Sequence, residues 1–348
     1  MIPAPAEAPP MSQPPGNPQV SVRNWPGFAS LPARDSNFGQ LKRTMGAFPR
    51  RRMMRALAAL ALTPLLAAAP APAKPPVAPP SPTPAPATVP VPLPPAVQQI
   101  DDAERAFAQA VAQSGIVQGF RQFASPDAVM FLPDPTPAQP ALAEARWPGD
   151  LLWRAQYVGV AQSGDLAFSA GPSQLRGGGG RPSGGFYLTA WRRQPNGGWK
   201  FVLDHAADMP PTLWDLAPKP LTAINTEPPA GAPSNEGMRE ADGSLNAALP
   251  KGGAEAFAQR LDDQIILMRT LRPVAQGKHR ALALVADCPP ILEATTLGGS
   301  RSMDGSLGYT YGRARWSGPM GPVAGYYVRV WRATPQGWRL LADQLTER

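Results

Sequence analysis

The chain repeats one long pattern. Residues 164–208 contain GDLAFSAGP and then GGFYLTAWRRQPNGGWKFVLDHAAD, and residues 305–347 contain GSLGYTYGR and then AGYYVRVWRATPQGWRLLADQLTE. In this alignment Trp191 corresponds to Trp331. Self-similarity at a fixed spacing is typical of duplicated structural units. The sequence therefore favours two copies of one fold over a single large domain.

The similarity extends to the start of each copy. Gly115 followed by IVQGFRQF precedes PDAVMFL in the first copy, and Gly252-Gly253 followed by AEAFAQRL precedes DDQIILM in the second. The repeated unit is thus a whole domain of about 110 residues, enough for one modest core. The predicted boundaries are 98–215 for the first domain, 216–234 for a linker and 235–348 for the second domain.

The first copy shows the pattern of two helices followed by strands. Apolar residues recur at helical spacing between Ile100 and Val111, which predicts a helix near residues 99–113 and a second short helix after Gly115. Segments rich in aromatic and β-branched residues predict strands at 128–132, 151–161, 165–175, 184–194 and 198–208. Asn196-Gly197 is a strong hairpin signal between the last two.

Alternation along the last predicted strand assigns side chains to its two faces. One face is expected to carry Trp199, Phe201, Leu203 and His205, and the other Lys200, Val202 and Asp204.

The segment before the repeats is typical of an exported protein. Arg50, Arg51, Arg52 and Arg55 precede an apolar run of fourteen residues, and the small-x-small pattern Ala-Pro-Ala ends at Ala73. The run is shorter than the roughly 20 residues that cross a bilayer as a helix. We expect a cleavable signal peptide over 45–73 and a periplasmic or secreted product without a transmembrane segment. Residues 1–44 are expected to be a non-native or disordered extension, and 74–97 a Pro-rich linker.

Charge, cysteine and histidine content limit the partners and ligands that the chain is expected to bind. After residue 73 the chain holds 25 Lys and Arg against 23 Asp and Glu, so the basic balance of the whole chain does not indicate nucleic-acid binding. Cys288 is the only cysteine, and His205 and His279 are the only histidines, in different repeats. We therefore expect no intrachain disulfide, no transition-metal site and no cofactor.

The motifs FASPDAVMFLPDP and WRRQPNGGWKFVLD, set after two helices, resemble the nuclear transport factor 2-like superfamily, in its SnoaL-like or ketosteroid-isomerase-like bacterial branch. Both copies fit, over about two thirds of the chain. The resemblance implies an α+β fold of two tandem cone-shaped domains, each a curved antiparallel sheet wrapped around two to three helices. The second copy is expected to be a degenerate repeat.

The resemblance also implies where chemistry would lie. In ketosteroid-isomerase-like enzymes a carboxylate at the end of the first strand removes a proton beside a carbonyl, and donors inside the cone stabilise the oxyanion. Asp134 is the nearest counterpart, although the first helix has no Tyr to match the family's donor. His205 is a second candidate base if it faces the cavity. Each also has a structural interpretation, as a turn carboxylate or a satisfied histidine.

Aromatic residues are candidates for an apolar ligand pocket, or for ordinary core. The pocket candidates are Trp153, Tyr187, Trp191 and Asp204. We expect an exported module that binds a small apolar molecule or acts as a structural or interaction module without catalysis. The alternative is an isomerase, cyclase or lyase with its active site in the first domain. Because this family often dimerises, the two copies are expected to pack sheet to sheet within a monomer.

Overall fold

A computed structural model describes residues 92–228 and 236–348. We call these two stretches the first half and the second half. The predicted extension over 1–44, the signal peptide over 45–73 and most of the linker over 74–97 lie outside the described residues. Part of the predicted linker between the repeats, residues 229–235, also lies outside them.

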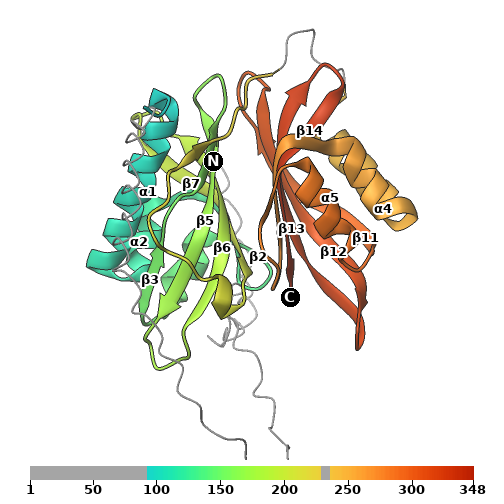
Figure 1. The fold of residues 1–348 in the computed structure, drawn as a ribbon. Coiled ribbons are helices and arrows are strands. Elements are labelled where there is room, and N and C mark those ends of the chain that lie inside the picture. The colour runs from blue at the N-terminus through green and yellow to red at the C-terminus, as the bar shows by residue number, and fades with distance from the viewer. Residues whose placement is uncertain (1–91, 229–235) are drawn as a thin grey trace, which may run out of the picture. The chain divides into compact units, whose positions relative to one another are not determined.

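The first half has two helices followed by one sheet (Figure 1). Its elements are α1 (Pro95–Ser114), α2 (Ile116–Phe123), β1 (Ala124–Phe131), β2 (Pro135–Pro137), α3 (Ala138–Glu144), β3 (Asp150–Trp153), β4 (Tyr157–Val160), β5 (Leu166–Arg176), β6 (Ser183–Arg193), β7 (Trp199–Asp208), a 3₁₀ turn (Pro211–Leu213) and β8 (Thr222–Ala223). The sheet order is β2-β1-β7-β6-β5-β4-β8, and β3 also pairs with β5. The predicted strand at 151–161 is therefore two short strands, and the linker contributes β8.

The second half repeats this order. Its elements are α4 (Met238–Arg260), β9 (Leu261–Arg269), β10 (Ala275–Gln276), α5 (Lys278–Ala286), β11 (Ile291–Arg301), β12 (Leu307–Gly318), β13 (Gly321–Thr334) and β14 (Gly337–Glu347). The sheet order β10-β9-β14-β13-β12-β11 matches the order β2-β1-β7-β6-β5-β4 of the first half, where β3 and β8 are additional strands. Helix α4 has a kink at Gly252, where φ is −171° and ψ is 69°, so it corresponds to α1 and α2 together.

The predicted α+β class, with two tandem domains, is confirmed. Neighbouring strands are antiparallel apart from β1 with β7, β9 with β14 and β4 with β8, which are parallel. In Figure 1, α1 and α2 cover one face of the first sheet, and α4 and α5 cover one face of the second. The helices and the sheet of each half therefore enclose an interior.

Each interior holds its own apolar cluster. Phe107, Phe120 and Trp191 belong to the cluster of the first half, and Phe257 and Trp331 to that of the second. Burying aromatic side chains of this size supplies much of the stability of a domain.

A third cluster joins the faces of the two sheets that point away from their helices. It combines Leu188 and Leu203 of the first half with Ile266, Val328 and Leu341 of the second. Polar contacts cross the same boundary, among them Gln344 Nε2, which donates to the carbonyl oxygen of Phe186 at 2.7 Å. The two halves are thus in direct sheet-to-sheet contact.

Candidate functional site

Asp134, the first predicted base, lies on the surface. Its side chain is 46% exposed and pairs with Arg348 at 2.8 Å. Its other carboxyl oxygen accepts a hydrogen bond from the hydroxyl of Tyr326 at 2.5 Å. Both partners belong to the second half, so Asp134 contributes to the contact between the halves and does not reach the interior of the first.

His205, the second predicted base, lies in the contact between the sheets. Its Nε2 is 2.9 Å from the hydroxyl of Thr346, and its ring centroid is 4.2 Å from that of Phe131. Burial lowers the pKa of His205 to about 3, because the charged imidazolium would lose its hydration. The imidazole is therefore neutral near neutral pH, and it does not line the interior where a base would be needed.

A bulge in β7 explains why the predicted faces are wrong. Trp191 pairs with Phe201 and Ala190 pairs with Leu203, so Val202 is the extra residue. One extra residue moves every later side chain to the opposite face. Trp199 and Phe201 thus share the interior with Asp204, whereas Leu203 and His205 face the second half. Asp204 and His205 point to opposite faces, as expected for neighbours on a strand.

The interior of the first half contains a cavity of about 30 Å³. Its lining combines apolar and aromatic side chains with polar ones. The lining residues are Phe107, Phe120, Leu151, Trp153, Ser173, Tyr187, Thr189, Asp204 and Ala206. A water molecule needs roughly 10–15 Å³ measured in this way, so the cavity has room for water as it stands. Three of the predicted pocket residues, Trp153, Tyr187 and Asp204, line it.

Glu104 of α1 organises the polar side of this interior. Its carboxylate accepts hydrogen bonds from Trp153 Nε1 at 2.7 Å, Ser169 Oγ at 2.5 Å and the Tyr187 hydroxyl at 3.1 Å. Trp191, the fourth predicted pocket residue, is fully buried and donates from Nε1 to Ser169 Oγ at 2.8 Å. Burial raises the pKa of Glu104, although its three donors act in the opposite sense.

Asp204 is a second carboxyl group in the same interior. It accepts a hydrogen bond from Thr189 Oγ1 at 2.5 Å. Burial, and to a lesser extent the charge of Glu104, raises the pKa of Asp204 to about 7. The first half therefore holds two buried acids close to a cavity, and no Lys, Arg or His is among the residues that line it.

The second half has the same row of cross-strand positions. Ser169, Thr189 and Asp204 are neighbours across β5, β6 and β7. Thr310, Arg329 and Asp343 occupy the equivalent places on β12, β13 and β14. Trp331 Nε1 donates to Thr310 Oγ1 at 2.8 Å, as Trp191 does to Ser169.

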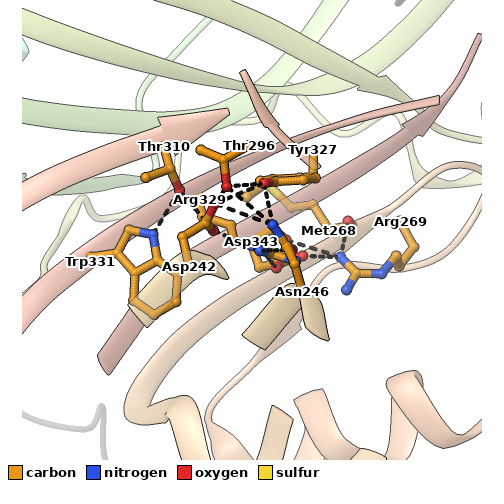
Figure 2. A network of polar contacts seen from close by, with 10 residues as sticks. All are labelled: Asp242, Asn246, Met268, Arg269, Thr296, Thr310, Tyr327, Arg329, Trp331 and Asp343. Carbon is orange, nitrogen blue, oxygen red and sulfur yellow. Dashed lines mark hydrogen bonds and ion pairs between the residues drawn. The ribbon is translucent and has the colours of Figure 1, made fainter. Parts of the chain in front are cut away.

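Arg329 fills the position that Thr189 has in the first half. Figure 2 shows Arg329 among its polar partners. Its guanidinium donates to Asp242 Oδ1 at 2.7 Å and to Asp343 Oδ2 at 2.9 Å. It also lies over the Tyr327 ring, with the guanidinium carbon 3.9 Å from the ring centroid. Arg269 pairs with Asp343 at 2.6 Å. Burial would raise the pKa of Asp242, but Arg329 and the hydrogen bonds to the carboxylate lower it.

Two further equivalent positions differ between the halves. Ala206 lines the cavity opposite Tyr187, and Leu345 stands opposite Tyr327 in the second half. Ser173 pairs with Gly185, and Ala314 holds the equivalent place opposite Gly325. Smaller side chains at 189 and 206 thus leave space in the first half, and a hydroxyl at 173 makes that space more polar.

Glu104, Ser173 and Thr189 are not among the site residues predicted from the sequence. A signal for Glu104 was present, since it follows Ile100 by four residues and precedes Phe107 by three, which places it on the buried face of α1. The signal for Thr189 was its alignment with Arg329. Neither residue belongs to a catalytic motif.

Within the described residues, no group of three or more His, Cys, Asp or Glu side chains is arranged to hold a metal ion. Over the same residues, each helix is either too short or too polar to cross a membrane.

No protein-family model and no curated protein matches the chain. It is similar to the solved structure of a ketosteroid isomerase-like protein from Erwinia carotovora atroseptica, at 13% identity and a TM-score of 0.29, over 32% of this chain and 92% of that one. An NTF-2 like protein of unknown function from Shewanella oneidensis has 13% identity and a TM-score of 0.27, over 31% and 95% of the two chains. An NTF2-like protein from Cytophaga hutchinsonii has 13% identity and a TM-score of 0.27, over 32% and 95%.

These matches concern the fold alone, at this level of identity. The order of helices and strands in each half agrees with the α+β arrangement that the sequence resemblance implied, helices first and a mainly antiparallel sheet after them. The equivalent strands follow the same order in the two sheets, which supports the duplication that the sequence repeat predicts.

Proposed function

We propose that this chain is a small-molecule-binding module whose site is the interior of the first half. The observation that supports the proposal is a difference between the two halves of the chain. The same buried row is filled and charge-balanced by Arg329 in the second half, and is hollow beside Asp204 in the first. The second half then serves as a structural partner that covers the first sheet.

The size and lining of the cavity limit the ligand. Pockets for drug-sized ligands measure about 300–1,000 Å³, well above the 30 Å³ found here. The ligand is therefore small, or it displaces an aromatic wall residue such as Trp153 as it enters. A lining of aromatic and polar side chains suits a molecule with a short apolar body and one polar head group.

Proton-transfer catalysis is the second candidate function, and one observation favours it. Asp204, with a pKa of about 7, and the hydroxyl-bearing Tyr187 line the same cavity. A group that titrates near the operating pH is well suited to act as a general acid or base. Incubating the protein with a bound ketone ligand in D₂O would test this. Exchange at the carbon beside the carbonyl, lost in Asp204→Asn, would support catalysis, and no exchange would exclude it for that ligand.

Export is part of the proposal and is supported by the leader pattern that ends at Ala73. Mass spectrometry of the protein recovered from its native host tests it. The expected mature chain begins at or close to Lys74. A chain that retains residues 45–73 would contradict cleavage.

Indole signals in the NMR spectrum provide the test of binding. Trp153 Nε1–H donates to Glu104 in the first half, and Trp338 Nε1–H donates to the Glu236 carbonyl oxygen in the second, where it serves as an internal reference. In a screen of small amines, alcohols, ketones and acids, we expect some compounds to shift the Trp153 signal and leave that of Trp338 unchanged.

A pair of reciprocal variants controls the screen. Ala206→Leu copies Leu345 and fills the cavity, so it should abolish the Trp153 shifts. Leu345→Ala alters the equivalent place in the second half and should leave them intact. A screen in which no compound shifts the Trp153 signal, or in which the shifts survive Ala206→Leu, would contradict the proposed function.

A further inference from the structure

We propose that the head group bound in the first half is a small organic cation, an alkylammonium or alkylguanidinium ion. It would take the place that the Arg329 guanidinium occupies in the second half. This inference rests on the proposed function, because it assigns a ligand class to the same interior.

The second half shows which partners a cation finds at this position. Arg329 is 1% exposed and contacts two carboxylates, Asp242 and Asp343, and the face of the Tyr327 ring. An aromatic face attracts a cation through its quadrupole, and a charge-assisted hydrogen bond is stronger than a neutral one. In effect the second half carries its own bound cation, supplied by β13.

The first half keeps these partners and lacks the cation. Glu104 accepts from Ser169 and Tyr187 as Asp242 accepts from Thr310 and Tyr327. Asp204 stands where Asp343 stands, and Tyr187 where Tyr327 stands. In the described part of the chain, neither Glu104 nor Asp204 forms an ion pair.

Ser173 gives an independent indication of a missing ligand. The residue is 5% exposed and lines the cavity, and its hydroxyl has no hydrogen-bond partner. A buried polar group without a partner is costly, and native proteins rarely keep one. Ala314 in the second half shows that the fold does not need a hydroxyl there. An N–H donor of the ligand would satisfy the Ser173 oxygen.

Charge balance sets the expected pH dependence. Burial without a cation favours the protonated forms of Glu104 and Asp204, and the pKa of both groups is raised. The Tyr187 hydroxyl, the third titratable group facing them, stays protonated because its pKa is raised well above its usual value. A cation binds the ionised carboxylates, so it must displace a proton. Its affinity should therefore rise as the pH increases towards and through about 7.

Two ligands of nearly the same shape test the charge. Methylguanidinium and N-methylurea differ mainly in charge, and each is titrated into the full chain at low millimolar concentration while the Trp153 and Trp338 indole signals are followed. We expect methylguanidinium to shift the Trp153 signal. N-methylurea should bind at least roughly 30-fold more weakly, as for the loss of a buried charged hydrogen bond.

Substitutions test whether methylguanidinium binds in the cavity of the first half. Asp204→Asn should remove the preference for methylguanidinium, and Ser173→Ala should weaken its binding without lowering the unfolding temperature, because the hydroxyl that it removes has no partner in the unliganded protein. Thr189→Arg supplies the second half's own cation and should abolish binding. Asp208→Asn is the matched control, because Asp208 lies on the same strand with its pKa likewise raised to about 7 by burial but does not line the cavity.

The outcomes separate this inference from the proposed function. N-methylurea binding as tightly as methylguanidinium, or binding of neutral compounds alone, would overturn the cation and leave the site intact. Failure of every compound to shift the Trp153 signal would overturn both. A preference for methylguanidinium that survives Asp204→Asn would also overturn the assignment.

Discussion

Residue 189 and its counterpart 329 decide the character of the two interiors. Thr189 leaves Asp204 with one neutral donor, whereas Arg329 bridges two carboxylates. Removing one partner of a buried ion pair strongly destabilises a protein, because an uncompensated charge remains buried.

We expect Arg329→Met to lower the free energy of unfolding by about 3–5 kcal/mol. Arg315→Met is the matched control on β12, where the side chain is 60% exposed, and it should change stability by no more than about 0.5 kcal/mol. Chemical denaturation of the three proteins measures both effects. A loss below that of the control would show that the Arg329 network does not hold the second half together.

Asp204 should make stability depend on pH. Its pKa in the folded protein is about 7, above the usual value of 3.8, so the folded state binds the proton more tightly. The resulting stabilisation is complete below about pH 4 and is lost as the pH rises through 7, at no more than about 1.4 kcal/mol per pH unit. The stability of the wild type relative to Asp204→Asn should fall over this range. A difference that stays constant between pH 4 and 8 would contradict the raised pKa.

Part of the site could be predicted from the residues. Trp153, Tyr187 and Asp204 were identified as pocket candidates, and they line the cavity. Asp134 was favoured because a family motif has an acid near that position, but in this chain the residue follows the strand on an exposed turn and pairs with Arg348. Sequence proximity to a motif does not determine the direction of a side chain.

At the scale of elements, the turn between β6 and β7 depends on one glycine. Gly197 has φ of +84°, a conformation that costs an L-residue about 1–2 kcal/mol. We expect Gly197→Ala to destabilise the chain by that amount. Gly198→Ala is the neighbouring control without a positive φ, and its added Cβ would lie 3.4 Å from the Asn196 side chain. Equal unfolding midpoints for the two variants would contradict the role of Gly197.

Hairpins and strands were predictable because their signals are local. Pro195 to Gly198 marks the turn, and the predicted strand at 198–208 matches β7 within a residue. The bulge at Val202 was not predictable, because it depends on how β7 registers with β6 and β1, and no local residue pattern announces it. That single residue determines that Asp204, and not His205, enters the interior.

At the scale of the whole molecule, the two sheets stabilise each other through the cluster that contains Leu188. Leu188→Ala should cost about 2–5 kcal/mol, as for other large-to-small core substitutions. It should also speed amide hydrogen exchange in the sheets of both halves. Leu142→Ala, in the separate cluster of the first half, should act mainly on that half. Exchange that changes only in the first half for Leu188→Ala would contradict the mutual stabilisation.

The duplication itself was predictable at this scale, because matched aromatic and glycine positions survive in both copies. The difference between the copies was not, since the consequence of Thr189 against Arg329 appears only when both interiors are seen in three dimensions. Divergence at a few buried positions has placed a guanidinium in the interior of the second half, where the first half has a cavity.

A crystal structure of the full chain grown with methylguanidinium tests this claim most directly. We expect a planar group stacked on Tyr187 and hydrogen-bonded to Asp204, in the place that corresponds to the Arg329 guanidinium. An interior of the first half that holds only water or is closed by Trp153, with methylguanidinium absent or bound elsewhere, would contradict it.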